Sequence, residues 1–226
     1  VWVASADGVG IQINRGDRVK IVNSKVSSSD SYGIHFSNGF GDNNVISNNN
    51  ISSNGSYGIH MANNSGTISG NTISSNSDSG IFIGNGSGGE GTSITGNKLT
   101  SNTLYCIQIS ACNQNCSITG NVTEGNSDYG IYIGTGGAEG ITVSGNTSKN
   151  EGTGGFLVKR IDQAVITGNL ISDDGTATYG IRLFEDGSTT MKGNSIVGNT
   201  IEGFTGASAR AIELDGLDTT VNSINN

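Results

Sequence analysis

The sequence has no run of apolar residues approaching the 18 or more that a membrane-spanning helix needs, so no membrane span is predicted. Charged residues make up only 13% of the chain and leave a net charge of −8, which argues against a nucleic-acid partner. The chain has three cysteines, and its two histidines lie far from them, so it lacks the ligand cluster of a zinc site. No segment repeats its apolar residues with the 3.6-residue period of an amphipathic helix.

What the sequence does contain is an apolar residue, usually an isoleucine after a glycine, that recurs every 22 to 31 residues. A regular period of this length is the signature of a solenoid, in which each repeat buries its apolar face only against its neighbours. Apolar and polar residues alternate around these positions, which predicts short strands stacked in coils. The recurring residues are Ile11, Ile34, Ile59, Ile81, Ile107, Ile131, Phe156, Ile181 and Ile212.

Most repeats also contain a segment of the form apolar, polar, glycine, asparagine. Glycine and asparagine tolerate the backbone conformation of a sharp corner, so each coil is predicted to turn at this segment. Stacking would then align the asparagines in a ladder, with side-chain amides bonded to the coils above and below. The expected members are Asn49, Asn71, Asn97, Asn121, Asn146, Asn169 and Asn199.

The two signatures at this period resemble the parallel β-helix repeats of the pectin-lyase-like superfamily, from Val9 to about Asn222. The resemblance implies an all-β fold, a right-handed parallel β-helix solenoid of about nine coils. No change of composition marks a linker, so residues 1–226 are expected to form a single domain. The superfamily includes polysaccharide lyases, glycoside hydrolases, epimerases, phage tailspikes, adhesins and non-enzymatic surface proteins, so the fold alone does not decide the function.

The cysteines and the glycosylation sequons give information about the cellular compartment of the protein. Cys112 and Cys116 flank a short corner and could close a local disulfide, which would fit an oxidising environment. Cys106 takes the place of a repeat glycine and is expected to be a small buried residue. Among the N-x-S/T sequons, Asn54 and Asn85 lie in predicted outer turns and are the candidates for glycosylation.

The outward residues of the glycine-isoleucine strands are the candidates for carbohydrate binding. Aromatic rings can stack on the apolar faces of sugars, while amides and imidazoles bind sugar hydroxyls. The alternative is that these aromatic residues only pair with each other across neighbouring strands. The candidates are His35, His60, Phe82, Gln108 and Tyr132.

Catalytic candidates are confined to the last coils. A glycoside hydrolase needs two carboxylates, and a calcium-dependent pectate lyase needs a carboxylate cluster with a basic residue. Arg182 and Glu213 would occupy adjacent rungs, so the alternative is a cross-strand ion pair on a solvated face. No cofactor is expected, except calcium if the protein is a lyase. The candidates are Arg182, Glu213, Asp173, Asp174 and Lys159.

An alginate-type epimerase motif, Tyr-Gly-x-Asp-Pro-His-Glu, begins at Tyr32-Gly33-Ile34 but is not continued by His35-Phe36, and the chain has no proline. The surface composition, rich in serine, threonine, asparagine and glycine, predicts an extracellular or cell-surface location. The chain begins at Val1 without a signal peptide, which fits a processed form or a fragment of a longer solenoid.

Neither end of the sequence can form the amphipathic helix that covers the last rung in most β-helices of this superfamily. Trp2 and Val3 at one end, and Leu217 and Val221 at the other, are expected to mediate end-to-end association into a homo-oligomer or filament. The favoured hypothesis is therefore an extracellular structural or adhesive protein. The alternatives are a polyuronate lyase or C5-epimerase and a carbohydrate-binding, tailspike-like module, with a polysaccharide as partner.

Overall fold

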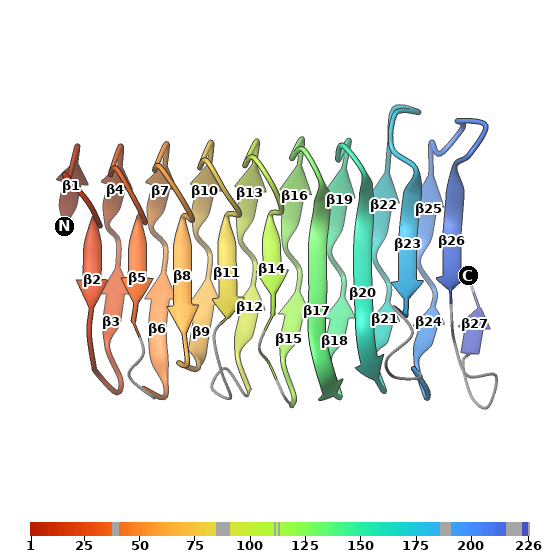
Figure 1. Ribbon diagram of the computed structural model, residues 1–226, viewed down its shortest axis with the longest axis horizontal. Coiled ribbons are helices and arrows are strands. Elements are labelled where there is room, and N and C mark those ends of the chain that lie inside the picture. Colours follow the sequence, from red (N-terminus) through yellow and green to blue (C-terminus); the bar gives the residue numbers. More distant parts are fainter. Residues whose placement is uncertain are drawn as a thin grey trace.

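The computed structural model describes residues 1–37, 41–84, 91–110, 112, 114–185, 191–215 and 223–225, with the backbone alone for 135–138 and 223–225. In this part of the chain the secondary structure consists of short β-strands that wind into a solenoid, with the two termini at opposite ends (Figure 1). Three sheets, which we call A, B and C, run along the solenoid. All described strand pairs are parallel, which confirms the predicted all-β solenoid.

Successive strands of the chain enter sheets A, B and C in turn, so each sheet is built from every third strand. Sheet A contains β1 (Trp2–Ala4), β4 (Lys25–Ser27), β7 (Asn50–Ser52), β10 (Thr72–Ser74), β13 (Lys98–Thr100), β16 (Val122–Glu124), β19 (Thr147–Lys149), β22 (Leu170–Ser172) and β25 (Thr200–Glu202). Sheet B contains β2 (Ile11–Ile13), β5 (Ile34–Phe36), β8 (Ile59–Ala62), β11 (Ile81–Gly84), β14 (Ile107–Ile109), β17 (Tyr129–Glu139), β20 (Gly154–Asp162), β23 (Tyr179–Phe184) and β26 (Arg210–Asp215). Sheet C contains β3 (Lys20–Val22), β6 (Asn44–Ser47), β9 (Gly66–Ser69), β12 (Ser93–Thr95), β15 (Ser117–Thr119), β18 (Thr142–Ser144), β21 (Val165–Thr167), β24 (Ser195–Val197) and β27 (Ser223–Asn225).

The core consists of columns of apolar side chains that point into the solenoid from the three sheets. In sheet B, Ile59 pairs in register with Ile34 and Ile81, and all three are fully buried. Ile131 is also fully buried, so the recurring residues point inward as the alternation predicted. Each such side chain contributes roughly 1.5–3 kcal/mol of hydrophobic stabilisation, which offsets the entropy of ordering a glycine-rich chain.

The predicted asparagine ladder lies at the corner between sheets C and A, and its members are buried. Asn121 shows the repeated pattern: its side-chain oxygen accepts from the backbone and side-chain nitrogens of Asn97, each at 3.0 Å. Its own amide nitrogen donates to Asn146 at 3.0 Å and to the Ile94 carbonyl at 2.9 Å. Gly120, with a φ of 62°, makes the sharp turn that directs Asn121 inward. The ladder therefore satisfies backbone groups that the corner would otherwise leave unpaired.

A second ladder, which the sequence analysis did not predict, lies at the corner between sheets A and B. Each member after the first accepts a hydrogen bond from the backbone N–H of the member before it, as Asn76 does from Asn54 at 3.1 Å. The ladder ends at Glu151, whose carboxylate replaces an asparagine amide. The members are Ser29, Asn54, Asn76, Asn102, Asn126 and Glu151.

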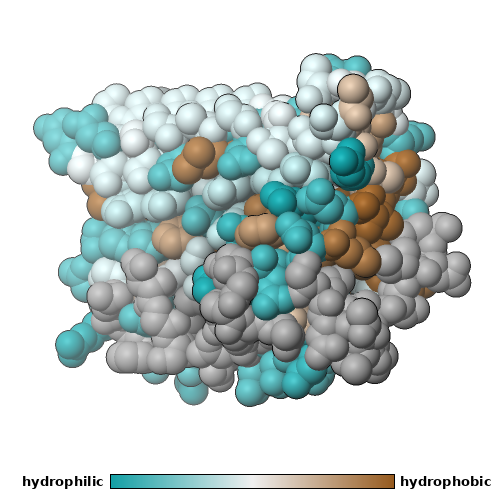
Figure 2. All heavy atoms as spheres, turned by 45° about the vertical axis from the view of Figure 1, so that its right-hand side comes forward, coloured by the Kyte–Doolittle hydropathy of each residue, from teal (hydrophilic) through white to brown (hydrophobic). Residues whose placement is uncertain are grey.

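The two ends of the solenoid differ in how they expose apolar residues. Val3 packs against the core in register with Val26, whereas Trp2 lies outside it, 74% exposed and 5.6 Å from the Lys25 ammonium. Towards the C-terminal end Figure 2 shows an area of hydrophobic surface, and Leu214 is 39% exposed on the last described strand of sheet B. Leu217 and Val221, expected at this end, lie outside the described residues.

Candidate functional site

The outer face of sheet B gathers the five side chains predicted to bind carbohydrate. His35 pairs in register with His60, which in turn pairs with Phe82, and the column continues through Gln108 to Tyr132. The five residues therefore occupy successive rungs of one column. The parallel register of short strands produces this alignment, because equivalent residues of neighbouring coils lie one strand spacing apart.

The N-terminal part of this face is a cluster of stacked rings. The rings of His35 and His60 are parallel, with centroids 4.8 Å apart, and the rings of Tyr32 and Tyr57 both pack against His60 at tilted angles. His60 is only 4% exposed, and burial, with a smaller contribution from the nearby His35, lowers the pKa of His60 to about 4. The imidazole of His60 is therefore neutral at physiological pH and closed off from solvent.

Two stacked ring pairs on the face are built alike, and we call each an aromatic module. The first module consists of Tyr57, Asp78, Phe82 and Gly84. The rings of Tyr57 and Phe82 stack with centroids 4.7 Å apart. Burial and, to a smaller extent, the negative charge of nearby Asp78 raise the pKa of Tyr57 to about 12. The Phe82 ring covers Gly84, where an added Cβ would overlap it.

The second module consists of Tyr105, Asp128, Tyr132 and Gly134. The rings of Tyr105 and Tyr132 stack with centroids 4.7 Å apart. Burial, together with the negative charge of nearby Asp128, raises the pKa of Tyr105. The Tyr132 ring covers Gly134 as Phe82 covers Gly84 in the first module. Tyr105 and Tyr132 are half-buried, so this module reaches the surface.

Gln108 lies between the two modules. It pairs in register with Phe82 on one side and with Tyr132 on the other. Its side-chain oxygen accepts a hydrogen bond of 2.8 Å from the Ser79 hydroxyl, and the residue is half-buried. The middle of the face thus alternates a ring pair, an amide and a second ring pair.

At the C-terminal end of the face the catalytic candidates Arg182 and Glu213 form the cross-strand ion pair that was the alternative to a catalytic role. The carboxylate of Asp215 lies 3.7 Å from the same guanidinium. The guanidinium also lies over the ring of Phe184, 4.5 Å from its centroid. Lys159 is nearby, with its ammonium 5.1 Å from the Phe184 centroid. The guanidinium of Arg182 and the carboxylate of Glu213 thus neutralise each other.

Asp173 and Asp174 do not lie on this face. They belong to the loop between β22 and β23, where Asp173 accepts hydrogen bonds from the backbone N–H groups of Gly175 and Ala177 at 2.7 and 2.8 Å. Asp174 accepts from the Thr176 hydroxyl at 2.9 Å. Both carboxylates therefore stabilise a turn, and the structure does not gather the predicted catalytic residues into one cluster.

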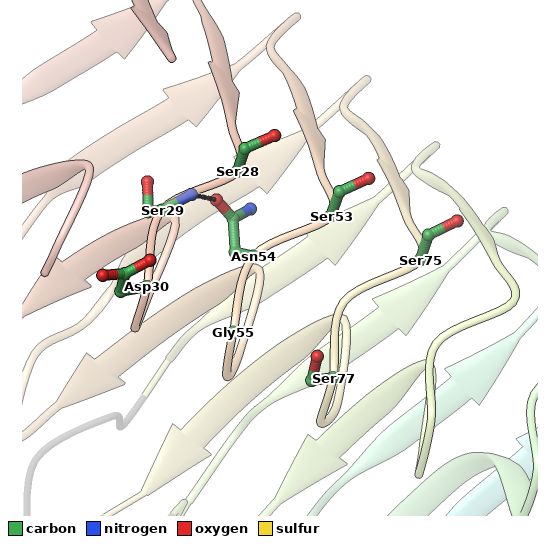
Figure 3. A pocket seen from close by; sticks show the side chains of 8 residues that line it. All are labelled: Ser28, Ser29, Asp30, Ser53, Asn54, Gly55, Ser75 and Ser77. Atoms are coloured by element: carbon green, nitrogen blue, oxygen red, sulfur yellow. Dashed lines mark hydrogen bonds between the residues drawn. The ribbon is translucent and has the colours of Figure 1, made fainter. Parts of the chain in front are cut away.

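The glycosylation candidate Asn54 was wrong. Asn54 is 1% exposed, and its amide nitrogen donates to Asn76 at 2.8 Å, so the second ladder occupies the atom that a glycan would need. The other candidate, Asn85, lies outside the described residues. Asn54 also borders a serine-lined groove at the corner between sheets A and B, where its oxygen accepts from the Ser29 N–H (Figure 3). The groove is lined by Ser28, Ser29, Asp30, Ser53, Asn54, Gly55, Ser75 and Ser77.

Cys112 and Cys116 form a disulfide, and Cys106 is a free, fully buried thiol. Among the described residues, no group of three or more histidine, cysteine, aspartate or glutamate side chains is placed to hold a metal ion. The same part of the chain contains no helix long and apolar enough to cross a membrane.

Solved structures of similar fold include the A-modules of the mannuronan C-5 epimerases AlgE6 and AlgE4 of Azotobacter vinelandii, with TM-scores of 0.72 and 0.69 and 17% and 16% identity. These matches cover 100% of this chain, which spans only 63% and 60% of the two structures. A DFA-IIIase mutant from Arthrobacter chlorophenolicus A6 matches 90% of this chain and 56% of its own, with a TM-score of 0.51 and 16% identity. At such low sequence identities the structural similarity is evidence of a shared fold alone.

No curated protein sequence matches the chain. The model of the family described as "Periplasmic copper-binding protein (NosD)" matches residues 89–212. The model of the family described as "Right handed beta helix region" matches residues 3–148, well over half of the chain. Together with the stacked parallel coils, this match shows that the protein belongs to the right-handed β-helix family.

Proposed function

We propose that the outer face of sheet B binds a carbohydrate chain and that the protein acts as a structural or adhesive β-helix outside the cytoplasm. The observation that carries this proposal is the pair of aromatic modules. Each presents a half-buried tyrosine beside a carboxylate and stacked on a second ring, which is half-buried in Tyr132 and 9% exposed in Phe82, and Gln108 lies between the modules. Aromatic rings stack on the apolar faces of sugars, while amide and hydroxyl groups form hydrogen bonds with the sugar hydroxyls.

The names of the similar structures support the same class of ligand, because a mannuronan epimerase acts on a polysaccharide. The location is supported by the Cys112–Cys116 disulfide, since disulfides persist in oxidising compartments. It is also supported by the word "Periplasmic" in the description of the family that matches residues 89–212.

Affinity electrophoresis in gels containing cellulose derivatives, xylan, mannan, pectin or alginate tests the proposal. At least one polysaccharide should retard the wild-type protein, and Tyr132→Leu should weaken the retardation, because leucine keeps an apolar side chain but removes the ring. Thr142→Ala, on the outer face of sheet C, is the matched control and should migrate like the wild type. If no polysaccharide retards the protein, or if Tyr132→Leu is retarded equally, the proposal is wrong.

End-to-end association is part of the proposed structural role. It is supported by the hydrophobic area at the C-terminal end and by the partly buried Ile212 and exposed Leu214 on the edge strand β26. An edge strand with apolar neighbours favours pairing with another chain. Electron microscopy and sedimentation at increasing concentration should show linear oligomers, and a monomer at all concentrations would contradict this part of the proposal.

A polyuronate lyase or C5-epimerase is the second candidate, because Tyr129 lies close to Arg182 on the same face. Burial raises the pKa of Tyr129 to about 12, so its hydroxyl is protonated at neutral pH. Arg182 is neutralised by Glu213, so we expect no unsaturated, ultraviolet-absorbing products from polyuronates with calcium, and no epimerisation by proton NMR. Turnover that Arg182→Ala abolishes would favour the enzyme over the binding protein.

A further inference from the structure

The two aromatic modules are related by a shift of two coils. Tyr105 follows Tyr57 by 48 residues, and each of the other three members follows its counterpart by 50. The strands involved, β8, β11, β14 and β17, are consecutive neighbours in sheet B (Figure 1). At the spacing of neighbouring strands, the shift is about 9.6 Å along the solenoid axis.

The likeness of the modules extends to their contacts. In both, the ring centroids are 4.7 Å apart, a carboxylate lies near the tyrosine hydroxyl, and the second ring lies over a glycine. Because the same arrangement recurs at a fixed interval, a ligand that contacts both modules in the same way needs a chemical repeat of that length.

We propose that the ligand is an extended, uncharged β-1,4-linked glycan that lies parallel to the solenoid axis across both modules. In such a chain successive sugar rings turn over, so the same ring face recurs at every second sugar. The length of that disaccharide unit is close to the rise of two coils. Equivalent sugars then contact the two modules, and the sugar between them lies against Gln108. An α-1,4-linked chain curls and loses this match.

The charges around the modules favour an uncharged glycan. Asp78 and Asp128 are half-buried beside the two ring pairs, where they would repel a chain that carries a carboxylate on every sugar. The ammonium of Lys159 lies 6.0 Å from the Tyr132 centroid, at one edge of the second module. One cation at the edge does not offset two carboxylates within the modules, so a polyuronate is disfavoured.

This inference rests on the proposed function, and isothermal titration calorimetry with oligosaccharides of defined length tests it. Cello-oligosaccharides of two to six sugars should bind with an affinity that rises at least about tenfold once the chain spans both modules, because the second contact becomes intramolecular. Malto-oligosaccharides and oligouronates of the same lengths should show no such rise. Phe82→Leu and Tyr132→Leu should each remove the rise while thermal denaturation shows that both variants fold. Thr142→Ala should keep it.

The outcomes separate the inference from the proposed function. If glycans bind without a length-dependent rise, or if malto-oligosaccharides or oligouronates bind as tightly as cello-oligosaccharides, the two-coil match is wrong and glycan binding by this face still stands. If no oligosaccharide or polysaccharide binds at all, both fail.

Discussion

The side-chain amide of Asn126 donates a hydrogen bond of 2.8 Å to the carboxylate of Glu151, and this contact ends the second asparagine ladder. The Asn126 backbone N–H donates to the same oxygen at 2.8 Å, and the Ser148 hydroxyl donates to the other oxygen at 3.2 Å. Thr123 and Ser148 point inward from sheet A. The equivalent inward residues of the flanking coils are the apolar Leu99 and Ile171. The core is therefore locally polar around one buried carboxyl group.

Glu151→Gln should stabilise the protein at neutral pH. Burial raises the pKa of Glu151 despite its hydrogen bonds, so the unfolded chain releases this proton at lower pH than the folded one. Its contribution to stability is present below the unfolded pKa and is lost as the pH rises through the folded pKa. Glutamine keeps an acceptor for Asn126 and removes the titration, so thermal denaturation should give a higher Tm at neutral pH and a flatter pH profile.

Glu151→Ala provides the contrast. It leaves the buried backbone N–H of Asn126 without an acceptor and removes one of the two acceptors of the Asn126 side-chain amide, which should lower the free energy of unfolding by about 1–3 kcal/mol. If the glutamine variant were as unstable as the alanine variant at neutral pH, the ionised carboxylate would be stabilising, contrary to this interpretation.

Asn121→Ala should lower the free energy of unfolding by about 1–3 kcal/mol, because it removes the acceptor of two buried Asn97 donors. Urea denaturation measures the difference. Asn50→Ala is the matched control, since Asn50 is exposed at the start of β7 and lies outside both ladders. Equal stability of the two variants would show that the ladder contributes nothing.

The first ladder could be predicted from the sequence because all its asparagines except Asn49 follow glycine in a constant apolar-polar-Gly-Asn segment. The second could not, because three of its four asparagines follow serines in a serine-rich region and its ends are Ser29 and Glu151. Once the register is known, the signal is visible as Asn54, Asn76 and Asn102, spaced by 22 and 26 residues. The burial of Asn54, and with it the failed glycosylation candidate, follows from the same missed ladder.

The outer face of sheet B was likewise predicted only in part. The outward column was predicted, because period-two alternation fixes which residues of a strand share a face. The modules were missed because each combines residues of two coils, as Tyr57 joins Asp78 and Phe82, and because they recur only at every second coil. A module that recurs at every second coil is not visible when each repeat is compared only with the next one.

His60→Phe should make the protein more resistant to acid. Both ring nitrogens of His60 lack a hydrogen-bond partner among the described residues, and its surroundings are the rings of His35, Tyr32, Tyr57 and Phe82. Burial, and to a smaller extent His35, lowers its pKa from 6.5 to about 4. Between these values the unfolded chain binds a proton that the folded chain excludes, so stability is lost as the pH falls from 6.5 towards 4.

The loss has an upper limit of about 3.5 kcal/mol, from about 1.4 kcal/mol for each unit of pKa difference. Phenylalanine cannot take up the proton and continues the ring stack towards Phe82, so the variant should keep its Tm over this range where the wild type loses stability. His35→Phe is the control with a smaller effect, because His35 is half-buried and burial lowers its pKa less. Calorimetric melting at several pH values between 4 and 8 measures both variants. A wild type and a His60→Phe variant that lose stability in parallel would show that the buried imidazole is not the acid-sensitive group.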